Sequence, residues 1–152
     1  MRGNQLSGSR RQKGAAAIEF AAVFVIFFGV FYALVSYSLP LLMLQSFNAA
    51  ASEAVRRSVA LSPGIGSATY ATQVVTQAKT TVLDQLYWMP PSLNFAASDI
   101  NVTLVSGLLT VTITYPKSRL IQVLPVLTLP FIGEVPKLPN NLSAQASLQL
   151  VP

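Results

Sequence analysis

The first half of the chain alternates little between apolar and polar positions, because one long apolar run dominates it. Residues 15–39 are mainly apolar, and no Lys, Arg, Asp or Glu occurs from Phe20 to Ser52. A helix needs about 20 such residues to cross a hydrocarbon core roughly 30 Å thick. The run therefore predicts a transmembrane helix over residues 15–44, with a kink at Pro40, which cannot donate a helical hydrogen bond.

Beyond the span, the apolar positions take a helical spacing. Residues 41–61 are predicted to continue the helix, and small or apolar positions recur along one side of it: Phe47, Ala50, Ala51, Ala54, Val55 and Ser58. The Ser-Pro-Gly-Ile-Gly cluster at residues 62–66 predicts a stop and a turn. A second amphipathic helix is predicted over residues 67–86, with its apolar side facing a sheet.

The spacing of apolar positions then changes from 3.6 to 2. Residues 100–105 and 109–115 alternate around Ser106-Gly107, which predicts a hairpin with one wet, threonine-bearing face. Residues 142–150 alternate as well and predict a third strand. Residues 116–141 contain five prolines and predict a long loop that has room for one short strand or turn near residues 120–129.

These elements predict an α+β protein with a long N-terminal transmembrane helix. That helix continues into a small head, which adds a second helix and about three antiparallel strands. The charge distribution then gives a direction. Four of the ten basic residues, Arg2, Arg10, Arg11 and Lys13, precede the span, and the rest of the chain has six basic and five acidic residues. Basic residues stay on the cytoplasmic side.

Three segments follow from that rule: a cytoplasmic basic leader at residues 1–14, with residues 1–13 disordered, the transmembrane helix, and an exported head at residues 45–152. The lipid bilayer is the first predicted partner. Nucleic acid is not a predicted partner, because no basic face remains once the leader is set aside.

Composition disfavours catalysis. The chain contains no Cys and no His, which excludes disulfides, Cys/His metal sites and histidine-dependent nucleophiles. Its acidic residues beyond the span are far apart in sequence and show no paired-carboxylate spacing. We therefore expect no enzyme activity, no cofactor and no metal.

Glu19 is the one acidic residue at the mouth of the span. Taken alone, it is interpreted as an interfacial acid paired with Arg11 or Lys13. The aromatic stripe that follows is suited either to lipid or to partner helices. The candidate helix-packing residues are Phe20, Ala21, Ala22, Phe24, Phe28 and Gly29.

The order of these features resembles the processing site of type IV pilins and pseudopilins: basic residues, Gly14, four small or apolar residues, Glu19-Phe20 and an apolar span. With the alanine-rich segment at residues 49–57, the chain resembles the TadE-like proteins, minor pseudopilins of the tight-adherence (Flp) pilus apparatus. Tyr115-Pro116 and the strand with Ala144 and Ala146 are part of that resemblance. It covers the first 60 residues well and the remainder only in layout.

The resemblance implies a pilin-like fold and cleavage between Gly14 and Ala15 by a prepilin peptidase. Glu19, then the fifth residue, would neutralise the new amine of Ala15 in a neighbouring subunit. The implied partners are pilin, a second pseudopilin and the inner-membrane platform. The implied location is the bacterial inner membrane, with the head in the periplasm.

The function that the resemblance implies is that of a minor pseudopilin for assembly of a type IVb-like Flp pilus. The alternative is a signal-anchored periplasmic binding module of an envelope or secretion complex that is never cleaved.

Overall fold

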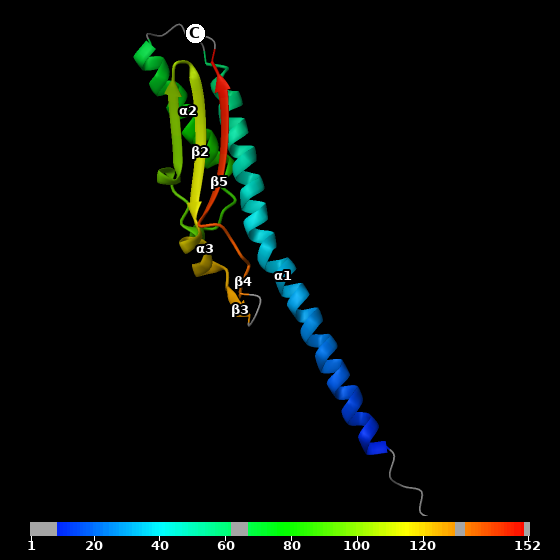
Figure 1. Cartoon of the computed structure of the whole chain (residues 1–152). Helices are drawn as coiled ribbons and strands as arrows, with labels where there is room; N and C mark the ends of the chain where they lie inside the picture. Colours follow the sequence, from blue (N-terminus) through cyan, green and yellow to red (C-terminus); the bar gives the residue numbers. More distant parts are fainter. Residues whose placement is uncertain (1–8, 62–66, 130–132, 151–152) are drawn as a thin grey trace, which may run out of the picture.

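A single long helix connects the two parts of the molecule (Figure 1). The computed structural model describes residues 9–61, 67–129 and 133–150. Helix α1 (Ser9–Ser58) has 50 residues and runs through Pro40 without a break, although its axis changes direction gently along its length. Residues 9–13 are helical, so the prediction of disorder is wrong there. Arg, Gln and Lys are good helix formers and extend the helix backwards from the span.

The part of α1 beyond the span carries the predicted packing side. All six positions named from the sequence are buried: Phe47, Ala50, Ala51, Ala54, Val55 and Ser58. They pack against helix α2 (Ser67–Gln85) and against the sheet. α1 ends at Ser58, three residues before the predicted end, and the predicted stop at residues 62–66 lies outside the described residues.

Three antiparallel strands form the sheet, in the order β1-β2-β5. They are β1 (Ile100–Val105), β2 (Leu108–Pro116) and β5 (Asn141–Gln149), which confirms the three predicted strands. Ser106 and Gly107 form the β1–β2 turn with φ of 50° and 77°, and such two-residue turns favour glycine. A Cβ on Gly107 would also lie 2.6 Å from the Gln149 side chain.

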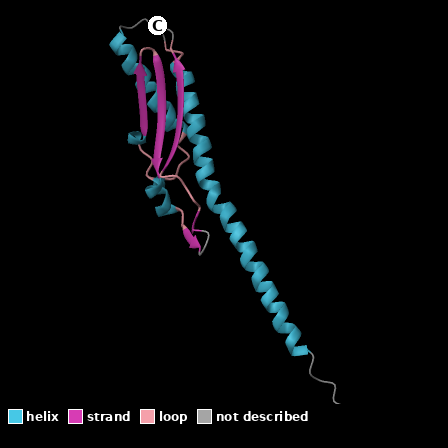
Figure 2. Cartoon of the chain, in the orientation of Figure 1, coloured by secondary structure: helices cyan, strands magenta, loops and turns pink. Residues whose placement is uncertain are grey.

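The two faces of the sheet differ in their surroundings. α1 packs on β2 and β5, and α2 packs on β1, so both long helices cover the same face. In Figure 2 the strands lie in front of α2. The covered face is apolar, with Val111, Ile113 and Tyr115 fully buried, whereas Asn101, Thr103 and other polar positions are exposed. This matches the predicted wet face and α+β class.

The proline-containing segment differs from the prediction of a long loop. It folds into helix α3 (Lys117–Val123) and a small hairpin of β3 (Leu127–Leu129) and β4 (Gly133–Val135). Pro116 is the last residue of β2, Pro125 lies between α3 and β3, and Pro136 and Pro139 lie between β4 and β5, so none of these four is inside a helix. Two 3₁₀ turns, Pro91–Leu93 and Ala97–Asp99, connect α2 to β1.

One buried ion pair connects this segment to the head. Arg119 of α3 donates to both carboxylate oxygens of Asp99, and its guanidinium lies 4.8 Å from the ring centre of Tyr115. The Tyr115 hydroxyl donates to the carbonyl oxygen of Leu93 at 2.5 Å, and burial raises the pKa of Tyr115. The cluster fixes α3 at the end of β2. From α3 the chain continues into the β3–β4 hairpin, which lies beside α1.

Candidate assembly interface

The N-terminal part of α1 is not covered by the head. Every residue from Gly14 to Phe31 is exposed, whereas Tyr32 and Ala33 are half-buried and Ser36 is buried. We call residues 14–31 the free half of α1 and residues 32–58 the packed half. Figure 1 shows the free half projecting away from the sheet. The most apolar 18-residue stretch of α1 has a mean hydropathy of 2.4, and none of it is buried in the head. By length and composition, α1 is therefore a candidate membrane span.

Aromatic side chains form two ladders along the free half. Phe20 and Phe24 stack at 6.1 Å between ring centres, Phe24 and Phe28 at 6.2 Å, and Phe27 and Phe31 at 6.4 Å. Each ring remains more than half exposed. Rings in this arrangement stiffen one side of the helix and present a continuous apolar surface to lipid or to another helix.

The predicted processing residues lie at the far end of this surface. Gly14, Ala15 and Glu19 are all exposed on the helix. A Cβ placed on Gly14 would meet no atom within 4 Å, and the same holds for Gly29. Neither glycine is therefore required by packing inside the described chain.

Glu19 and Glu53 occupy different electrostatic environments on one helix. Glu53 accepts hydrogen bonds from Arg56 and Arg57, at 2.8 Å and 2.6 Å, and these bonds lower its pKa to about 2. Glu19 has no hydrogen-bond or ion-pair partner among the described side chains, which do not include those of Arg11 and Lys13. Within the span, an acid without a partner is costly.

The remaining candidate packing residues lie on the same surface. Ala21 and Ala22 are exposed, as are the aromatic residues and Gly29. The structure therefore places all the residues named from the sequence on one exposed helical segment. Their contacts with other chains stay a prediction.

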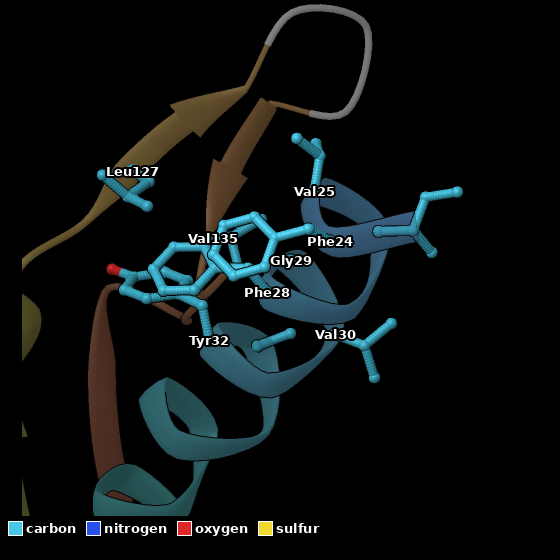
Figure 3. A pocket seen from close by; sticks show the side chains of 10 residues that line it. Phe24, Val25, Phe28, Gly29, Val30, Tyr32, Leu127 and Val135 are labelled. Atoms are coloured by element: carbon cyan, nitrogen blue, oxygen red, sulfur yellow. The ribbon is translucent and has the colours of Figure 1, made fainter. Parts of the chain in front are cut away.

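A groove separates the free half from the β3–β4 hairpin. Its α1 wall includes Phe24, Phe28 and Tyr32, and its opposite wall is formed by Leu127 and Val135. Figure 3 shows the Phe24, Phe28 and Tyr32 rings on the hairpin side, whereas Val30 points away from it. The lining is almost wholly apolar.

Two tyrosines of α1 hold the hairpin segment in place, and sequence reasoning missed both contacts. The Tyr32 hydroxyl donates to the Pro125 carbonyl oxygen at 2.5 Å. The Lys137 backbone N–H donates to the Tyr37 hydroxyl oxygen at 2.8 Å. Their partners lie 93 and 100 residues away in sequence, so no local pattern reveals the contacts.

One part of this chain is similar to a known protein family. A family model described as TadE-like protein matches residues 14–56, and this confirms the resemblance over that segment. No curated protein and no solved structure matches the chain. The match supports a role in tight-adherence pilus systems and contacts with other pilus components. The TadE-like family is not a family of enzymes. Within the described residues, no group of three or more acidic residues is placed to hold a metal ion.

Proposed function

We propose that this chain is a minor pseudopilin of a tight-adherence pilus, trimmed after Gly14 and assembled through the free half of α1. The observation that carries the proposal is the exposure of every residue from Gly14 to Phe31 on a helix whose other half is packed. The matched family segment begins at Gly14 and ends at residue 56, so it includes the free half, the proposed cleavage point and most of the packed half.

Gly14 supports the cleavage step because its own chain gives no reason for a glycine. A side chain there would meet no atom within 4 Å, and glycine costs a helix interior about 1 kcal/mol relative to alanine. A prepilin peptidase gives a reason, since a residue without a Cβ lets the backbone approach a narrow active site closely. In this proposal the enzyme cuts the Gly14–Ala15 bond on the cytoplasmic side.

Glu19 supports the assembly step. Cleavage leaves a positively charged amine on Ala15 and makes Glu19 the fifth residue of the shortened chain. Each charge is unfavourable in hydrocarbon alone, and charged residues within membranes pair with one another. Pairing Glu19 of one subunit with Ala15 of its neighbour satisfies both and fixes the axial register of the two helices. The aromatic ladders then pack in that register against pilin, a second pseudopilin or the inner-membrane platform.

The proposed topology follows from charge. The basic leader stays in the cytoplasm, α1 crosses the bacterial inner membrane, and the head lies in the periplasm. The head contacts the packed half of α1, so any force on α1 during assembly is transmitted directly to the sheet.

Processing is tested by the mass of the protein purified from membranes that contain a prepilin peptidase. The wild-type chain should lack residues 1–14, and Gly14→Leu should retain them, because a bulky side chain blocks the peptidase. The matched control is Gly29→Leu, which changes an equally uncrowded glycine of the same helix and should be trimmed normally. Normal trimming of Gly14→Leu would remove Gly14 from its role. A wild-type chain that keeps residues 1–14 beside an active peptidase would favour the uncleaved, signal-anchored module.

Assembly is tested separately with Glu19→Gln. We expect trimming after Gly14 to continue, while pilus yield and co-purification of pilus components fall at least tenfold, because the neighbour's amine loses its only proposed partner. The control is Glu53→Gln, which removes an acid whose partners, Arg56 and Arg57, lie in the same chain. Unchanged pilus yield in Glu19→Gln would contradict the intersubunit pairing and leave the cleavage proposal standing.

A further inference from the structure

The β3–β4 hairpin lies beside a part of α1 that a lipid bilayer should surround. Tyr32 and Tyr37 bond to backbone atoms of Pro125 and Lys137, so the segment between them is fixed at this level of the helix. From there the hairpin extends toward the N-terminal end of α1, because Leu127 and Val135 form a groove with residues as far along as Phe24.

The level of these residues in a membrane follows from the helical rise. At 1.5 Å per residue, a hydrocarbon core of about 30 Å takes about 20 residues of an upright helix. A core that begins at Ala15 ends near residue 35, and one that begins at Glu19 ends near residue 39. Tyr32 then lies about 4 to 10 Å inside the outer boundary. In both placements Tyr32 lies within the outer leaflet, whereas Phe24, at the far end of the groove, lies about 16 to 22 Å below the outer boundary.

The chemistry of the segment agrees with that level. Ile121, Val123 and Leu127 are large apolar side chains, each at least 40% exposed. Between Arg119 and Lys137 the one charged residue is Glu134, and its carboxylate accepts a hydrogen bond from Lys117 at 2.7 Å. Pairing is the usual condition for a charge near hydrocarbon.

The small size of the hairpin limits how deep it can lie. Three residue pairs join β3 and β4, and the outer edges of both strands leave backbone groups without a strand partner in the described chain. Such groups are not tolerated in the middle of a bilayer but are hydrated among headgroups. Burial of the hairpin at the level of Tyr32, about 5–10 Å as for interfacial helices, suits both the apolar side chains and the backbone.

We propose that the β3–β4 hairpin is a second membrane contact, which enters the outer leaflet beside α1 and sets the height of the head above the bilayer. The occupants of the groove are lipid acyl chains, which contact Leu127, Val135 and the Phe24–Phe28 ladder. The proposal requires that α1 spans the membrane, and it does not depend on cleavage at Gly14 or on pairing through Glu19.

The absence of cysteine from the sequence gives a direct test. The full chain carrying Leu127→Cys is labelled with an environment-sensitive NBD fluorophore and reconstituted into phosphatidylcholine–phosphatidylglycerol vesicles. Lipids with a nitroxide near the top of the acyl chain should quench this label several-fold more strongly than a label on Val105→Cys. Val105 is also an exposed apolar residue, but it is the last residue of β1, beside the β1–β2 turn. This turn lies at the end of the sheet opposite to α3 and the β3–β4 hairpin. Ile26→Cys on the free half serves as the positive control.

Val135→Cys provides an independent second position on the other strand. Labels at residues 127 and 135 that resemble the one at residue 105 in quenching and emission would overturn the proposal. The proposal would also be overturned if the labels at residues 127 and 135 moved into an apolar environment only after other pilus components were added, because the groove would then hold a protein helix. Far-ultraviolet circular dichroism of each labelled chain establishes that the helices and sheet are intact.

Discussion

The two halves of α1 belong to one continuous helix but have opposite surroundings. In the packed half, Phe47 is fully buried and stacks on Phe95, with ring centres 5.7 Å apart. In the free half, Phe28 is 52% exposed, stacks on Phe24 and lines the groove. The acids differ in the same way, since Glu53 has two arginine partners and Glu19 has none among the described side chains.

The contrast shows which residues the chain needs for its own folding. The small side chains at Ala50, Ala51 and Ala54 let the sheet and α2 approach α1, so the head itself accounts for them. No contact of the described chain accounts for Gly14, Glu19 or Gly29. Substitutions in the packed half should therefore change stability, and substitutions in the free half should change interactions with other molecules.

The largest expected difference is between two phenylalanines. Phe47→Ala should lower the free energy of unfolding of the head by about 3–5 kcal/mol, because it leaves a cavity between Phe95 and Tyr115. Phe28→Ala should change it by less than about 0.5 kcal/mol, as for other exposed positions. The measurement is denaturant unfolding of the full chain in detergent, followed by near-ultraviolet circular dichroism. Equal losses in the two variants would show that the free half also supports the head.

A smaller difference is expected when a small residue is enlarged. Ala51→Leu inserts three carbons where α1 is fully buried and should cost about 1–3 kcal/mol. Ala22→Leu adds the same atoms to an exposed position, where leucine fits a helix nearly as well as alanine. Thermal unfolding of both full-length variants measures the difference. A loss of stability in Ala22→Leu would mean that the free half packs on the head after all.

Periodicity was a reliable guide wherever one element buries one face. The six packing positions of α1 and the alternation in β1, β2 and β5 were predictable, because burial repeats every 3.6 or 2 residues there. The apolar span and the Gly14–Glu19 spacing could also be seen in the sequence, because both are local patterns. The candidate residues named from the sequence lie on one continuous helical segment, so a local pattern was enough to name them, and their roles stay predictions.

The segment after β2 could not be predicted in this way. α3 has only seven residues and one buried side chain, Leu120, so it has no periodicity to detect. Its position depends on the pairing of Arg119 with Asp99, twenty residues earlier, and that pairing is a tertiary contact. The hairpin was obscured by prolines, which suggest a loop even where they only separate short elements.

The smallest expected difference concerns the two acids and depends on pH. Hydrogen bonds from Arg56 and then Arg57 lower the pKa of Glu53 from 4.5 to about 2, so the pair stabilises the fold fully above about pH 4.5 and less as the pH falls toward 2. Glu53→Gln should therefore lower the Tm of the head slightly at pH 7, and the gap to wild type should close between pH 4.5 and 2. High salt should also reduce the gap, because the arginines are solvent-exposed. Glu19→Gln should leave the Tm unchanged across the same range, because no described group of its own chain pairs with it. A Tm gap for Glu19→Gln as large as that for Glu53→Gln would give Glu19 a partner within the chain, and the basic residues just before the span would be the first to test.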